Sequence, residues 1–121
     1  MNDTVLVIED EFLIGELIKM NLKMRRITCY VASTGLEGIE MFESQNPSIV
    51  LLDVRLPDID GWEVCKKIKH KNPDSIVIFM TAATQKRDRE TANKVGADDF
   101  IEKPFDIGDL VSIVNKYRIP Q

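Results

Sequence analysis

The sequence predicts a doubly wound α/β fold in which five parallel strands form one sheet and five helices cover both of its faces. Continuous apolar runs at 5–8, 49–52 and 76–80 are typical of strands buried on both faces, which belong to parallel sheets covered by helices. Strand and helix patterns alternate five times, which calls for right-handed crossovers between parallel strands. We expect one domain, residues 1–121, built as a three-layer sandwich.

The first half of the chain is predicted to contain three strands and two helices. The strands are 5–8, 27–31 and 49–53, and the helices are 11–24 and 36–44. Leu13, Leu17, Met20 and Met24 are predicted as the core-facing stripe of the first helix, widened by Ile14 and Ile18. The second strand is the most polar of the three, so we expect it at an edge of the sheet.

The second half continues the alternation. Helices are predicted at 62–69, 87–95 and 107–117, and strands at 76–80 and 99–102. Gly96 is the expected C-terminal cap of the middle helix. This pattern matches the flavodoxin-like arrangement with strand order 2-1-3-4-5, in which ligands bind beyond the carboxyl ends of the strands. Strands one and three are then neighbours at the point where the strand order reverses.

Composition excludes several classes of protein. The chain is 44% hydrophobic and 30% charged, with a net charge of −4, and it has no long apolar run or signal-peptide pattern. We therefore expect a cytoplasmic protein that neither enters a membrane nor binds nucleic acid through this domain. Cys29 and Cys65 lack metal-ligand spacing and are predicted as small buried residues, and His70 is predicted to lie at a solvated helix end.

Carboxylates follow the two strands that flank the reversal point. Glu9 and Asp10 come directly after the first strand, and Asp53 ends the third. Three carboxylates in one crevice repel one another, so either some are protonated or a cation neutralises them. Oxygen ligands at an open edge, without His or Cys nearby, favour Mg²⁺, with Mn²⁺ as an alternative.

The neighbouring strand ends add a hydroxyl and an ammonium group. Thr81 follows the fourth strand and Lys103 follows the fifth. A carboxylate, a divalent cation, a hydroxyl and an ammonium group together can receive a phosphoryl group, whose oxygens need compensating charge. Asp53 is the predicted nucleophile because it projects from the centre of these partners.

Four motifs in this order resemble the receiver domain of two-component response regulators, and the resemblance covers essentially the whole chain. They are Glu9-Asp10-Glu11, Leu51-Leu52-Asp53 with Leu56-Pro57-Asp58-Ile59-Asp60-Gly61, Met80-Thr81-Ala82, and Gly96-Ala97-Asp98-Asp99-Phe100-Ile101-Glu102-Lys103-Pro104-Phe105. The helix at 107–117 lacks an Arg-rich run, and in this the chain is similar to the single-domain regulators of chemotaxis and phosphorelays. The resemblance implies a regulatory domain that assists its own phosphorylation and slow dephosphorylation, rather than an enzyme.

The resemblance also implies a role for each site residue. Asp53 would accept a phosphoryl group from a histidine kinase or a histidine phosphotransfer protein. Glu9, Asp10, Asp53 and the backbone carbonyl of Arg55 would hold the metal. Lys103 would contact the phosphoryl group, and the Lys103–Pro104 peptide bond would be cis. Thr81 would move toward the phosphoryl oxygens and let Phe100 turn inward, which would change the surface at 87–117 that a downstream effector reads.

Two positions depart from the usual pattern of that family. Glu9 replaces a more frequent aspartate, and its longer side chain still permits direct or water-mediated metal binding. Arg26 stands where a glycine usually ends the first helix, at a cost of about 1 kcal/mol if the backbone is left-handed there.

Three residues suggest where a partner would bind and where a spectroscopic probe would report. Phe12 and Gly15 are predicted to form a low-relief patch on which a helix of the phosphodonor docks, and Trp62 is predicted as a half-buried reporter beside the acidic loop.

Two other functions remain open at this point. A flavodoxin-like module would bind a phosphate-bearing small molecule, although Glu9-Asp10-Glu11 would repel it. An aspartate-nucleophile phosphatase usually has an acid two residues after the nucleophile, where this chain has Arg55.

Overall fold

The computed structural model describes residues 4–82 and 86–118. Strands and helices alternate along the chain, and their bounds agree with the predicted ones to within two residues. In chain order they are β1 (Val5–Ile8), α1 (Phe12–Met24), β2 (Cys29–Ala32), α2 (Gly35–Gln45), β3 (Ile49–Asp53), α3 (Gly61–Lys71), β4 (Ile76–Thr81), α4 (Lys86–Lys94), β5 (Asp99–Glu102) and α5 (Ile107–Tyr117).

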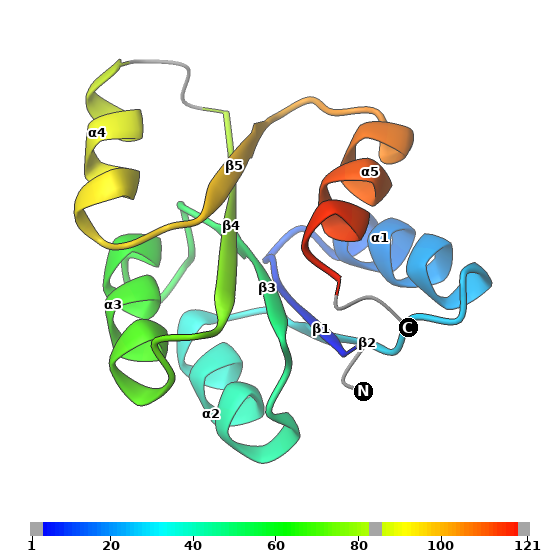
Figure 1. Cartoon of the computed structure of the whole chain (residues 1–121), viewed down its shortest axis with the longest axis horizontal. Helices are drawn as coiled ribbons and strands as arrows, with labels where there is room; N and C mark the ends of the chain where they lie inside the picture. The colour runs from blue at the N-terminus through cyan, green and yellow to red at the C-terminus, as the bar shows by residue number, and fades with distance from the viewer. Residues whose placement is uncertain (1–3, 83–85, 119–121) are drawn as a thin grey trace.

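The five strands form one parallel sheet in the order β2-β1-β3-β4-β5, as predicted. Helices α1 and α5 cover one face, and α2, α3 and α4 cover the other (Figure 1). Every residue of β1 and β3 is buried, because these strands are covered on both faces. The carboxyl ends of β1, β3, β4 and β5 therefore meet at the same edge of the sheet.

Alternation along each strand divides the apolar side chains between two cores. Leu6 and Ile8 point to the face covered by α2, α3 and α4, whereas Val5 and Val7 point to the face covered by α1 and α5. None of the helices in the described ranges is long and apolar enough to cross a membrane.

The predicted core face of α1 is wrong for its central stripe and correct for the flanking Ile14 and Ile18. Leu13, Leu17, Met20 and Met24 are exposed by 79%, 49%, 60% and 73%, respectively. The buried face of the helix consists of Gly15, Ile18 and Leu22, with Ile14 packed beside them. Helix α1 thus carries two apolar stripes, and only the one that includes Gly15 faces the sheet.

Gly15 allows the buried stripe of α1 to lie close to the sheet. A Cβ atom at this position would lie 2.9 Å from Cγ1 of Val31, so the absence of a side chain lets α1 approach β2 closely. Gly15 is buried, and the prediction that it contributes to an exposed docking patch is also wrong. Phe12, the other member of that patch, is exposed by 74%.

The minor predictions for the cysteines, the histidine and the Gly96 cap agree with the structure. Cys29 and Cys65 are buried and form no disulfide, and burial raises the pKa of their thiols to about 12 and about 11. Neither thiol is therefore a reactive group at neutral pH. His70 is exposed. Gly96 follows α4 with a φ of 87°, which is the left-handed conformation expected of a C-terminal cap.

Arg26 ends α1 in the left-handed conformation, with a φ of 63°. Its amide donates a hydrogen bond to Lys23 O (2.9 Å), and the amide of Ile27 donates one to Leu22 O (3.0 Å). We expect Arg26→Gly to raise the free energy of unfolding by about 1 kcal/mol, because glycine adopts this conformation without steric cost. Urea denaturation measures the change. Arg25→Gly is the control: Arg25 has a φ of −101° and should give no gain, and an equal gain from both variants would contradict the explanation.

Candidate functional site

The structure brings three carboxylates together at the carboxyl edge of the sheet. Glu9 and Asp10 follow β1, Asp53 ends β3, and one carboxylate oxygen from each lies within 4.8 Å of the other two. Glu9 and Asp53 are 1% and 6% exposed, whereas Asp10 is open to solvent. The predicted juxtaposition follows from the parallel pairing of β1 with β3, which are adjacent strands.

Lys103 reaches the cluster from the carboxyl end of β5, which is separated from β3 by β4. Its Nζ donates hydrogen bonds to Oε1 of Glu9 (2.6 Å) and Oδ2 of Asp53 (3.1 Å). The backbone amide of Lys103 donates to Thr81 O (2.8 Å), which holds the residue just beyond the β4–β5 pair. The Lys103–Pro104 peptide bond is cis. One ammonium group thus contacts two of the three carboxylates.

Burial and hydrogen bonding shift the pKa values of Glu9 and Lys103. Burial raises the pKa of Glu9 to about 7, even though the hydrogen bonds from Lys103 and the Glu11 amide oppose the shift. Burial also works against the charged form of Lys103, but hydrogen bonds to Glu9 and Asp53 outweigh it and raise its pKa. The raised pKa of Lys103 reflects the two carboxylates that face its single ammonium group. A bound cation would therefore stabilise the carboxylate cluster.

The donor set fits a hard divalent cation. All three groups are carboxylates, neither His nor Cys contributes to the cluster, and the exposed Asp10 leaves room for coordinated water. These are the preferences of Mg²⁺, which keeps several waters and takes few protein ligands. Two backbone amides fix the carboxylate orientations: Glu11 N donates to Oε2 of Glu9 (3.1 Å) and Arg55 N donates to Oδ1 of Asp53 (3.0 Å).

Thr81 and Phe100 lie in one neighbourhood beside the cluster. Thr81 ends β4 and is 5% exposed, and Phe100 is half-buried in β5. Both line a small hollow together with Trp62 and Arg89. Trp62 packs against Phe79 with 4.6 Å between ring centroids, so it is the partly buried residue that the sequence predicted.

Arg89 is a neighbour of Phe100 that the sequence did not reveal. Its guanidinium carbon lies 4.7 Å from the centre of the Phe100 ring, a cation–π distance. The same side chain forms an ion pair with Glu102 (2.9 Å). Arg89 therefore connects α4 to two residues of β5.

Asp58 and Gly61 shape the loop after β3, and sequence reasoning assigned them only to a turn. Asp58 accepts hydrogen bonds from the amides of Gly35 and Leu36 (2.8 Å each) at the start of α2, and these bonds, that of Leu36 foremost, lower its pKa. The amide of Gly61 donates to Val54 O (2.9 Å). The loop that carries Arg55 is thus attached to two helix N-termini. The contact of Asp58 with α2 could not be predicted from local patterns, because Asp58 and Gly35 are 23 residues apart in the chain.

Comparison with known proteins identifies the family of this chain. The sequence model of the response regulator receiver domain matches residues 5–115, nearly the whole chain. The chain belongs to this family. The match includes every residue of the carboxylate cluster, together with Thr81, Phe100 and Lys103.

Solved receiver domains have the same architecture. The receiver domain of the Francisella response regulator 1452 is 29% identical, with 96% of each chain covered and a TM-score of 0.89. A CheY-like receiver domain protein from Methanospirillum hungatei is 25% identical over 96% of this chain and 93% of that one, with a TM-score of 0.91. The chemotaxis protein CheY4 of Vibrio cholerae is 19% identical over 98% and 100%, with a TM-score of 0.92, and this likeness concerns the fold alone.

Proposed function

We propose that this receiver domain accepts a phosphoryl group on Asp53 from a histidine kinase or a histidine phosphotransfer protein, in a reaction that requires Mg²⁺. The observation that carries the proposal is the contact of Lys103 Nζ with both Glu9 and Asp53 beside a third carboxylate. An ordinary carboxylate at the end of a strand would lack this ammonium group and these neighbouring carboxylates, so the contacts of Asp53 distinguish it as the proposed phosphoryl acceptor. The proposed setting is the cytoplasm, where kinases of this type act.

The chemistry is a transfer between two nucleophiles. A carboxylate oxygen of Asp53 forms the new bond to phosphorus while the bond between phosphorus and the histidine nitrogen of the donor breaks. Lys103, already 3.1 Å from Oδ2 of Asp53, compensates charge on the phosphoryl oxygens. Glu9, Asp10, Asp53 and the carbonyl of Arg55 are the proposed ligands of Mg²⁺, which would neutralise charge on the transferred group.

Phosphorylation would be transmitted through Thr81 and Phe100. The Thr81 hydroxyl moves toward the phosphoryl group, and Phe100 turns into the space beside it. Arg89 must release the Phe100 ring in this step, because its guanidinium lies 4.7 Å from the ring centre. The surface of α4, β5 and α5 is then changed for an effector protein or domain. In this proposal the chain acts as a phosphorylation-controlled switch and not as an enzyme with repeated catalytic turnover.

The test is phosphorylation by acetyl phosphate, followed by intact mass spectrometry. With Mg²⁺ we expect a single adduct of about 80 Da, and with EDTA in place of Mg²⁺ we expect almost none. A steady release of phosphate from small phosphate esters, without an accumulating adduct, would instead identify an aspartate-nucleophile phosphatase.

Trp62 offers an independent readout of metal and phosphate binding. It contacts Phe79 and lines the hollow that contains Thr81 and Phe100. We expect Mg²⁺ to change the intensity of tryptophan emission, and beryllofluoride, a phosphoryl mimic, to change it further. Trp62 is the sole tryptophan, so the signal has one source. An emission spectrum unchanged at saturating Mg²⁺ and beryllofluoride would contradict the placement of both ligands.

A further inference from the structure

Helix α1 presents an apolar stripe to solvent, which we call the α1 stripe: Leu13, Leu17, Met20 and Met24. Single exposed apolar residues are ordinary, but a contiguous row of large ones on a soluble domain marks an interaction surface. Figure 1 shows α1 at the periphery of the molecule, beside α5 and away from the other three helices. All four side chains are at least 49% exposed, so the stripe is accessible along the length of the helix.

The spacing of the α1 stripe specifies the shape of its partner. Steps of four, three and four residues place the side chains in a single narrow row, as at the a and d positions of a coiled coil. Such a row packs against another helix, because its side chains fit into the spaces between side chains of a facing row. The occupant of the stripe is accordingly a helix and not an extended strand.

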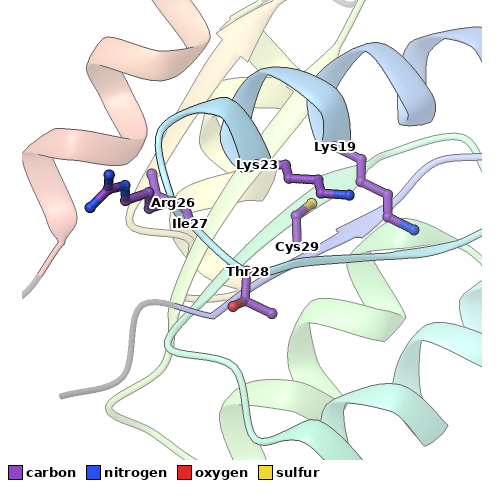
Figure 2. A pocket seen from close by; sticks show the side chains of 6 residues that line it. All are labelled: Lys19, Lys23, Arg26, Ile27, Thr28 and Cys29. Atoms are coloured by element: carbon purple, nitrogen blue, oxygen red, sulfur yellow. The ribbon is translucent and has the colours of Figure 1, made fainter.

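Charge along α1 indicates which helix fits. Glu16 lies in the N-terminal half of α1, which follows Glu11, and Lys19 and Lys23 lie in its C-terminal half, which precedes Arg25 and Arg26. Figure 2 shows three of these cations, Lys19, Lys23 and Arg26, around the end of the helix and the start of β2. A second copy of α1, laid antiparallel, sets each acidic end against the basic end of the other helix. A parallel copy would set like charges together.

We propose that two copies of this chain associate through antiparallel pairing of their α1 stripes. Leu17 of each copy packs on Met20 of the other at the centre, and Leu13 packs on Met24 at both ends. Glu16 of each copy then flanks the row beside Lys23 of the other. Glu16 and Lys23 form no ion pair with other described residues, so both are available for this contact.

The pairing is isologous, with the same surface used by both copies, as closed two-fold symmetry requires. Four apolar side chains per copy make a small interface, so the dimer is weak and its population depends on protein concentration. The inference rests on the fold of α1 alone and does not depend on the phosphoacceptor function.

Sedimentation equilibrium over a concentration series tests the pairing. The weight-average mass should rise from 13.8 kDa toward twice that value as concentration increases. Met20→Glu places a charge in both central layers and should leave the chain monomeric. Leu36→Glu is the matched control, because Leu36 is exposed by 59% against 60% for Met20 but lies on α2, and this variant should associate like the wild type.

A charge exchange tests the antiparallel register. Glu16→Lys and Lys23→Glu should each weaken association about tenfold, because each brings like charges together twice in the dimer. An equal mixture of the two variants should restore association, since the basic row of one then faces the acidic row of the other. Circular dichroism verifies that every variant is folded.

Three outcomes would overturn the proposal. They are a monomeric wild type at every concentration, Met20→Glu associating as strongly as the wild type, or a mixture that associates no better than the single variants. A monomeric wild type in which Met20→Glu slows phosphotransfer from a histidine phosphotransfer protein would assign the α1 stripe to the phosphodonor instead.

Discussion

Asp53→Asn should carry no phosphoryl group after incubation with acetyl phosphate and Mg²⁺, whereas the wild type gains about 80 Da. The amide of asparagine has nearly the shape of the carboxylate, so the hydrogen bond from the Arg55 amide to Oδ1 can remain. An amide oxygen is a poor nucleophile and carries no negative charge for Lys103 or a metal. The loss should therefore be complete without loss of the fold, as intact mass and circular dichroism would show.

Asp60→Asn is the matched control for this experiment. Asp60 lies on the loop that follows Asp53 and caps α3 by accepting a hydrogen bond from the amide of Trp62 (2.8 Å). Asparagine caps helices as well as aspartate does, so this variant should fold and gain the adduct. An adduct of normal yield on Asp53→Asn would mean that another residue is the acceptor, and the functional assignment would fail.

Gly61→Ala should destabilise the protein by about 2–3 kcal/mol and impair phosphorylation. A Cβ atom at Gly61 would lie 2.5 Å from the carbonyl oxygen of Asp53 and 2.7 Å from Cα and O of Val54. These are backbone atoms of the strand end, which cannot rotate away as a flexible side chain can. The substitution must therefore shift either α3 or the peptide unit that carries Asp53.

Gly108→Ala shows whether the effect is specific to Gly61. A Cβ atom at Gly108 would meet nothing within 4 Å, and the residue lies in the first turn of α5. This variant should gain up to about 1 kcal/mol in the free energy of unfolding, because alanine favours the helix. Urea denaturation of the two variants should thus give changes of opposite sign. Equal stability of Gly61→Ala and the wild type would show that the strand end accommodates the methyl group.

Most of the site could be predicted because it depends on strand ends. Glu9, Asp53 and Thr81 each end or follow an aliphatic run that is too apolar to be anything but a buried strand. Parallel strands have their carboxyl ends at one edge, so the order of the strands was enough to bring these residues together. The contacts of Lys103 with Glu9 and Asp53 follow from the same geometry.

Contacts between helices and loops could not be predicted in this way. Helix α1 has two apolar stripes of similar character, and periodicity alone does not say which one faces the sheet. The close approach of the buried stripe depends on Gly15 against Val31, a contact between residues on different elements. The position of Arg89 over Phe100 depends similarly on how α4 packs beside β5.

The sequence by itself determined the order of elements, the buried strands and the residues at their carboxyl ends, because these follow from local patterns and from the rules of parallel sheets. Only the tertiary structure decided that Leu13, Leu17, Met20 and Met24 face solvent, that Asp58 holds the start of α2, and that Gly61 lies against the backbone of Asp53. The physical reason is that helix rotation and loop attachment depend on close contacts between residues far apart in the chain, which periodicity does not contain.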